Sequence, residues 1–371
     1  MNSSPLSFIA KPIPIKSWLL AALMGLYCLL SLCAYFQWVA PSLDGRSDQH
    51  IAADSATYIY FADSLREGRR DPLVLAALSS FPNTAWTPVL IALALKSNLI
   101  MALTDYLFFV LALLLLKETY SFSMPVFAFL LLMNATTTIS LLSVNKEIID
   151  LLSVSLFLFA RKKGRWGLLV LSLMIAFLNR YEVSVVMLIF LVVQTKLNPL
   201  RRRRGMTLAF LILALSILLP LVASGALAKR SEEASEGGLI LILDSLEMHY
   251  LYAIAVIPKI AENLFGYLLN LSTWKALDDF SDVANSYIVL LNNLATAVVL
   301  VVLFRKRQFT TRSDLVYFAM MGGIFMAISL VIQPRYFYFV YVLLCLQAAR
   351  KSVNRTLSNS QYPQFPETAN A

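Results

Sequence analysis

The feature that most constrains this chain is the alternation of long apolar segments with short runs of basic residues. Four such runs stand between or after apolar segments: 161–165, 201–204, 305–307 and 350–351. Lysine and arginine in short loops of membrane proteins concentrate on the cytoplasmic side. Placing all four runs on that side fixes a topology, and it leaves several charged turns together on the opposite side.

Composition supports a membrane protein over a soluble one. Apolar residues make up 59% of the chain and charged residues 14%, against about 25% charged in a typical soluble domain. No ten-residue alternation typical of an outer-membrane barrel is visible. The sequence therefore predicts an all-α, polytopic helical membrane protein with about ten transmembrane helices and both termini cytoplasmic. The predicted spans are 17–40, 98–116, 124–143, 147–160, 166–179, 182–195, 206–226, 285–304, 314–332 and 336–349.

Residues 1–355 are predicted to form a single integral membrane domain with two long extracytoplasmic loops, 41–97 and 227–285. Residues 86–95 are too short to span and predict an interfacial or re-entrant helix. The tail 356–371, rich in polar residues and proline, is predicted to be a disordered cytoplasmic segment.

The net charge of +9 does not indicate nucleic-acid binding. The basic excess sits in short cytoplasmic loops, where it sets orientation and contacts membrane lipids, and no soluble domain offers a basic face.

Four predicted spans are short. Segments 147–160, 166–179, 182–195 and 336–349 have about 14 residues each, or roughly 21 Å of helix, whereas the hydrocarbon core is about 30 Å thick. With their cytoplasmic ends held by basic loops, their outer ends are predicted to stop below the surface and to line the floor of an outward-facing cavity. The charged residues at those ends are Lys146, Glu147, Arg180, Glu182 and Arg335.

Each of these charged turns has a structural and a functional interpretation. Glu147 favours a helix start, whereas Lys146 does not, so Lys146 either pairs with Glu147 or meets an anionic ligand. Arg180 either pairs with Glu182 or binds phosphate through its planar fork. Arg335 and Tyr336 suit an interfacial anchor. Together, the cations are predicted to form a binding site for a lipid-linked phosphate or diphosphate.

The first outer loop carries a candidate base. The stretch 54–65 predicts an amphipathic helix that places Asp54 and Tyr58 on one face. A carboxylate held over the membrane surface can act as general base toward a hydroxyl, although an ordinary solvated helix explains the same spacing. In the second outer loop, Asp278, Asp279 and Asp282 either bind a divalent cation or form a solvated acidic turn. No Walker loop, dinucleotide fingerprint or zinc spacing is present.

The order of these features resembles the C-superfamily of membrane glycosyltransferases, including bacterial members that assemble capsule and O-antigen. The matching features are an N-terminal span, the first-loop motif 54–58, the Asn-Lys-Glu turn, the Arg-x-Glu turn and the late Arg335-Tyr336. The resemblance implies a multi-pass protein of the bacterial inner membrane. It also implies transfer of a sugar from a polyprenyl-phosphate donor to an acceptor glycan or lipid on the extracytoplasmic face.

Carried onto this chain, the resemblance makes Asp54 the catalytic base, with Asp48 in reserve. Arg180, Arg335 and Lys146 would hold the donor phosphate. Two other functions stay open: a polymerase of lipid-linked repeat units, and a transporter or flippase of a lipid-linked sugar. The acidic first loop favours the transferase over the polymerase, and the lack of visible inverted repeats argues against the transporter.

Overall fold

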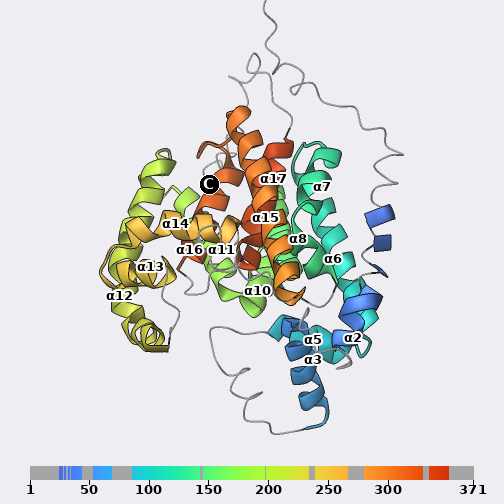
Figure 1. The fold of residues 1–371 in the computed structure, drawn as a ribbon. Helices are drawn as coiled ribbons and strands as arrows, with labels where there is room; N and C mark the ends of the chain where they lie inside the picture. Colours follow the sequence, from blue (N-terminus) through green and yellow to red (C-terminus); the bar gives the residue numbers. More distant parts are fainter. Residues whose placement is uncertain are drawn as a thin grey trace, which may run out of the picture.

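The structure, a computed structural model, describes residues 25–43 apart from 28, 31 and 34, then 53–68, 86–142, 145–196, 198–233, 239–265, 280–328 and 334–350. These residues form helices and no β-strand; an isolated antiparallel bridge joins Phe122 to Arg350. The predicted all-α class is therefore confirmed (Figure 1).

The helices follow one another with short connections through most of the bundle. In chain order they are η2 (Tyr35–Val39), α2 (Ala40–Leu43), α3 (Ala53–Arg66), α5 (Trp86–Ala94), α6 (Asn98–Thr119), α7 (Met124–Leu132), α8 (Ala135–Leu141), α9 (Lys146–Lys163), α10 (Trp166–Asn179), α11 (Tyr181–Gln194), α12 (Arg204–Glu233), α13 (Leu239–Met248), α14 (Tyr252–Phe265), α15 (Phe280–Arg305), α16 (Asp314–Met326), η3 (Pro334–Phe337) and α17 (Tyr338–Ala349).

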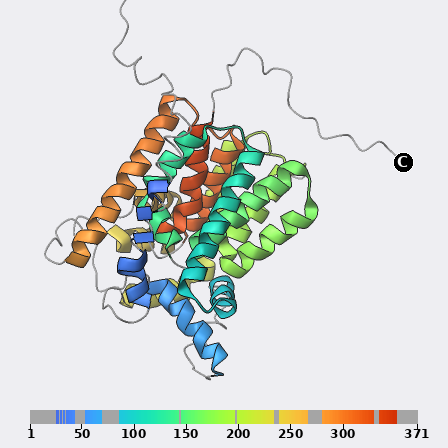
Figure 2. The ribbon, with the colours of Figure 1, turned by 90° about the vertical axis from the view of Figure 1, so that its right-hand side faces the viewer.

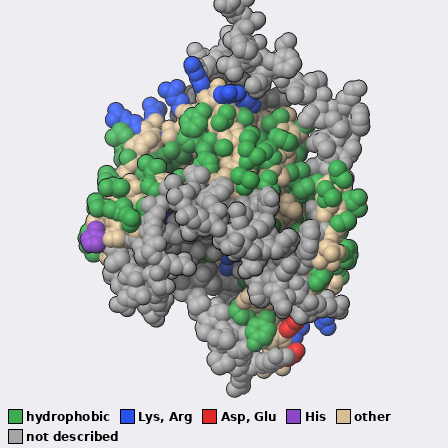
Figure 3. Space-filling view, in the orientation of Figure 1, with side chains coloured by type: hydrophobic (Ala, Val, Ile, Leu, Met, Phe, Trp, Pro, Cys, Tyr) green, Lys and Arg blue, Asp and Glu red, His purple; other side chains and the backbone are tan. Residues whose placement is uncertain are grey.

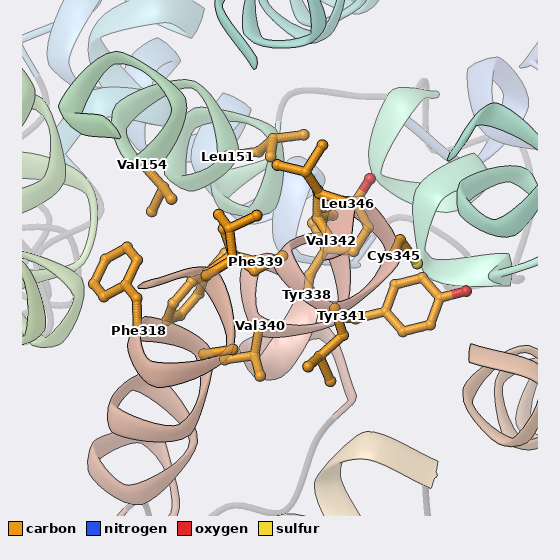
Figure 4. Packing of buried hydrophobic residues seen from close by; sticks show 14 of the residues in the cluster. Leu151, Val154, Phe318, Tyr338, Phe339, Val340, Tyr341, Val342, Cys345 and Leu346 are labelled. Atoms are coloured by element: carbon orange, nitrogen blue, oxygen red, sulfur yellow. The ribbon is translucent and has the colours of Figure 1, made fainter. Parts of the chain in front are cut away.

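Helix α17 lies at the centre of the bundle. All twelve of its residues are buried, and it packs against α7, α9, α15 and α16. Figure 4 shows its Phe339 and Val342 among Leu151 and Val154 of α9 and Phe318 of α16. A helix that is apolar on every side is stable only when neighbours surround it, so α17 organises the core around itself.

Helix α9 shows how the local sequence sets the ends of an element. Asn145 caps its start, where its side-chain oxygen accepts a hydrogen bond from the backbone nitrogen of Lys146. Gly164 ends it in the left-handed conformation, with φ of 66°, which glycine adopts at low cost. The basic residues 161–163 occupy the last turn, where their positive charges interact favourably with the negative end of the helix dipole.

The prediction of about ten spans is not confirmed. Among the described residues, α6 and the segment Arg204–Leu221 of α12 are long and apolar enough to cross a membrane, and α7 with α8 makes a third if this bent pair counts as one span. Other apolar helices, such as α10 and α11 with 14 residues each, are shorter than a full crossing requires.

Two segments differ from their predicted form. The expected straight span 124–143 is broken at Asn134, where α7 and α8 meet at 84°; the Asn134 side chain caps α8 by accepting from the nitrogen of Thr136, 2.9 Å away. The predicted second outer loop, 227–285, includes the end of α12, all of α13 and α14, and the start of α15. Helices α13 and α14 pack against α12 and against each other.

The basic runs meet at one end of the bundle. Asp314, at the start of α16, accepts from Arg204 at 2.5 Å and from Arg161 at 3.2 Å. Lys163 pairs with Glu118 at 2.8 Å, and Lys306 donates to the carbonyl of Ala348. Figure 3 shows lysine and arginine side chains gathered at the top of the view, above a broad apolar belt. The basic residues of several loops far apart in the sequence therefore share one end of the bundle.

Helices α3 and α5 lie at the opposite end, as Figures 1 and 2 show. Both were predicted, and both form: Tyr58 and Ala62 of α3 pack against Val89 and Ala92 of α5. Arg66, at the end of α3, donates to the carbonyls of Ala92 and Leu93 and so satisfies the end of α5. The pair therefore forms a small helical unit on the end of the bundle away from the basic runs.

Candidate functional site

Three turns far apart in the sequence meet at the end of the bundle that faces α3. They are the start of α9 at Asn145, the extended residue Arg180 between α10 and α11, and η3 before α17. Helices α9 and α10 pack along their lengths, which brings the first and second turns together. The third joins them through a ring contact between Arg180 and Tyr336.

A buried ionic core lies where these turns meet. Arg180 Nη2 is 3.2 Å from Glu147 Oε1, and Arg180 Nε is 3.4 Å from Asp150 Oδ2. The three side chains are 8%, 2% and 2% exposed, respectively. Asn179 donates through Nδ2 to Asp150 Oδ1 at 2.7 Å and to the carbonyl of Lys146 at 2.8 Å. One guanidinium thus compensates two carboxylates, and their geometry is fixed by an amide.

Asp105 of α6 adds a third buried carboxylate. Its Oδ2 accepts a hydrogen bond of 3.0 Å from the backbone nitrogen of Asn145, the residue that caps α9. Its Oδ1 has no hydrogen-bond partner among the residues that the structure describes. Asp105 is fully buried, so this carboxylate anchors the start of α9 to α6 and leaves one oxygen available inside the core.

Cations and aromatic rings contact one another beside this core. The Lys146 ammonium lies over the ring of Tyr58, 5.8 Å from its centre, which links α9 to α3. The ring of Tyr336 receives two guanidinium groups, Arg180 at 4.7 Å and Arg335 at 5.5 Å. Such contacts hold a cation over the face of a ring and so fix its position.

Most of the sequence-predicted site residues are therefore brought together. One series of contacts runs from Glu147 through Arg180 and Tyr336 to Arg335. A second contact joins Lys146 to Tyr58. Asn179 links these two groups of contacts, because its amide donates to the backbone carbonyl of Lys146 and to the carboxylate of Asp150. Glu182, in the first turn of α11, interacts electrostatically with Arg180 and Lys146.

The predicted ion pair between Arg180 and Glu182 is not the one that forms. Arg180 forms its ion pairs with Glu147 and Asp150 of α9, whereas the structural interpretation of the sequence paired it with Glu182. The physical reason is geometric: the helix that starts at Tyr181 carries Glu182 in its own first turn, while α9 presents two carboxylates one turn apart.

The remaining predicted residues lie partly or wholly outside the described part of the chain. Asp54 belongs to the first turn of α3, one turn before Tyr58, but its side chain is outside the described residues. Asp48, Asp278 and Asp279 are outside them altogether, as is the side chain of Asp282. Within the described ranges, no group of three histidine, cysteine or acidic side chains is arranged to hold a metal ion.

Asp150 and Asn179 are members of the site that sequence reasoning missed. Asp150 follows Glu147 by three residues, which places both carboxylates on one face of α9, and this spacing is a readable signal. Asn179 precedes Arg180 at the end of an apolar helix, where a buried amide stands out from its neighbours. Its two partners depend on how α9 and α10 pack, which no local pattern gives.

No protein-family model matches this sequence, and comparisons with curated proteins and with solved structures find no match either. Half-buried cations beside aromatic rings can hold an anion, and buried carboxylates can orient those cations.

Proposed function

We propose that this chain is a multi-pass glycosyltransferase of the bacterial inner membrane. It would move a sugar from a polyprenyl-phosphate-linked donor to an acceptor glycan or lipid on the extracytoplasmic face. The observation that carries the proposal is the meeting of Lys146, Arg180 and Arg335 at the end of the bundle opposite the basic runs. Lys146 contacts the ring of Tyr58 on α3, the helix that holds Asp54.

The positions of the charges support an extracytoplasmic site. With the basic end in the cytoplasm, the cluster at the other ends of α9, α10 and α17 faces outward. Helix α10 has 14 residues and α17 has 12, so they extend about 21 and 18 Å. Both are shorter than the hydrocarbon core of about 30 Å. A site at their outer ends is recessed, where the phosphate of a membrane-anchored lipid can reach it.

The cations divide into two roles. Arg180 is buried and already compensated by Glu147 and Asp150, so it positions the turn and the ring of Tyr336. Lys146 and Arg335 are half-buried and so are better placed to bind the donor phosphate. Electrostatic stabilisation of a leaving group is commonly the largest catalytic contribution.

The proposed reaction is a single displacement. The acceptor hydroxyl oxygen forms a bond to the anomeric carbon, and the bond from that carbon to the phosphate oxygen breaks. The hydroxyl proton passes to the carboxylate of Asp54, and the polyprenyl phosphate leaves with the electron pair, held by Lys146 and Arg335. The outcome is inversion at the anomeric carbon, because attack and departure occur on opposite faces.

The test is a deletion strain complemented with wild type, Asp54→Asn, Lys146→Gln or Arg335→Gln. Surface glycans and lipid-linked intermediates are analysed by mass spectrometry. We expect each variant to lose one defined sugar and to accumulate its donor; in vitro, each cation variant should lose about 10²- to 10³-fold in rate, the cost of removing one transition-state donor.

Lys196→Gln is the matched control, because Lys196 is an exposed cation beyond the end of α11, on the side of the basic runs. It should behave as wild type. Single repeat units replacing long chains would indicate the polymerase instead. Loss of the sugar from the surface glycans, with its lipid-linked form retained on the cytoplasmic side of the membrane, would replace the enzyme with a transporter.

A further inference from the structure

The lysine and glutamate side chains that the structure describes in the hairpin of α13 and α14 are all buried. Lys259 Nζ lies 2.8 Å from Glu247 Oε1, and the two side chains are 0% and 1% exposed. Glu262 and Asn263 of α14 are buried as well. Lysine and glutamate are rarely fully buried, and when they are they are paired, as Lys259 and Glu247 are here.

The outer face of the same hairpin is apolar. Ile257 is 71% exposed, and it lies among other exposed residues of this kind. They are Ile242, Tyr250, Leu251 and Ile254. A helix in contact with water turns its apolar stripe inward and its charges outward. Helix α14 does the reverse, and this polarity is typical of a segment surrounded by hydrocarbon.

Two hydrogen bonds fix the depth of α14 in the bundle. At its start, the nitrogen of Ala253 donates to Ser216 Oγ of α12 at 3.0 Å. At its end, the carbonyl of Leu264 accepts from Thr296 Oγ1 of α15 at 2.7 Å. Ser216 is about 18 Å along α12 from Arg204, and Thr296 is about 14 Å along α15 from Arg305, at the usual rise per residue.

Both ends of α14 therefore lie at similar depth, well inside a hydrocarbon core of about 30 Å. Figure 1 agrees, since α13 and α14 lie beside the middle of α12. The exposed side of α12 at this level is apolar too, with Leu213 and Ile217 each more than half exposed. The apolar surface of the candidate span thus continues onto the hairpin without interruption.

We infer that α13 and α14 form an intramembrane hairpin whose outer face contacts lipid acyl chains and whose inner face seals the Glu247–Lys259 pair away from water. The stretch 239–265 then enters the membrane, although its place between two spans suggested an aqueous loop. This inference does not depend on the reaction proposed above.

The test places single cysteines on the full-length protein in lipid nanodiscs, where both membrane faces are accessible. The background carries Cys28→Ser, Cys33→Ser and Cys345→Ala. Ile254→Cys and Ile257→Cys report on the hairpin. Leu213→Cys on α12 is the lipid-facing control, and Lys196→Cys is the aqueous control. Each cysteine carries a bimane label for quenching by brominated lipid, and unlabelled samples react with a membrane-impermeant maleimide.

We expect the two hairpin positions to match Leu213→Cys, with strong quenching by brominated lipid and at least tenfold slower maleimide reaction than Lys196→Cys. Rapid maleimide reaction without quenching would overturn the inference and return the hairpin to an aqueous loop. Weak quenching by brominated lipid together with slow maleimide reaction would overturn it as well, because the face would then be covered by protein. Correct folding of every variant is checked by size-exclusion chromatography before labelling.

Discussion

At the scale of single residues, Arg180 decides whether the site holds together. It is buried between Glu147 and Asp150, and its guanidinium also lies against Tyr336. Removing one partner from a buried ionic group leaves uncompensated charge, which costs about 3–5 kcal/mol. A surface ion pair such as Asp63–Arg66 contributes much less, about 0–1 kcal/mol.

Arg180→Met is therefore expected to lower the free energy of unfolding by about 3–5 kcal/mol. Adding Glu147→Gln should restore part of the loss, since the double variant has one fewer buried negative charge. Cys345, which is fully buried, provides the readout in a Cys28→Ser, Cys33→Ser background, because a thiol-reactive dye labels it only on unfolding. Equal stability of Arg180→Met and wild type would show that the buried pairing is not formed.

The sequence predicted which charges belong to this site better than it predicted their partners. Lys146, Arg180 and Arg335 stood out because charge at the end of a short apolar segment is costly. The choice of Asp150 over Glu182 as a partner of Arg180 depends on the packing of α9 against α10. That packing is a tertiary property, and single-sequence periodicity carries no information about it.

At the scale of elements, α16 and α17 approach closely at a pair of glycines that differ in their surroundings. A Cβ on Gly322 would lie 2.8 Å from Phe339 Cζ and 3.2 Å from Val340 Cγ2, both in the packed core. A Cβ on Gly323 would meet nothing closer than Ile260 Cδ1 at 3.5 Å, an ordinary contact. The helix crossing therefore needs Gly322 specifically.

Gly322→Ala is expected to destabilise the protein by about 1–3 kcal/mol through overpacking. Gly323→Ala should be neutral or stabilising, since alanine favours a helix over glycine by about 0.5–1 kcal/mol. The two substitutions are chemically identical and adjacent. A difference between the thermal unfolding temperatures of the two variants therefore reports the close approach of α17 to Gly322. A Gly322→Ala protein as stable as Gly323→Ala would contradict the crossing geometry.

Element boundaries were partly readable from the sequence. The helix at 54–65 and the short helix at 86–95 were predicted and form as α3 and α5, because both carry a clear apolar pattern. The break at Asn134 was missed, since a polar residue in an apolar run does not by itself indicate an 84° bend. Helices α13 and α14, of 10 and 14 residues, were missed because the stretch that contains them was assigned to an outer loop.

At the scale of the whole molecule, the separation of the basic end from the site predicts orientation. Alkaline phosphatase fused after Gly68 should be active in a bacterial host, whereas the same enzyme fused after Lys163 should be inactive. Green fluorescent protein fused after residue 371 should fluoresce. The physical reason is retention of short lysine- and arginine-rich loops in the cytoplasm. Activity after Lys163 combined with inactivity after Gly68 would invert the topology and place the site in the cytoplasm.

The shared carboxylate of Asp314 has a mechanical consequence. It joins Arg161 at the end of α9 to Arg204 at the start of α12, so three helices are clamped at one end. Helix α9 has 18 residues and extends about 27 Å from that clamp. A rotation of roughly 5° about the clamp displaces the far end of such a lever by roughly 2 Å. Holding the angle of α9 at this clamp therefore also holds Lys146 and Glu147 in place at its far end.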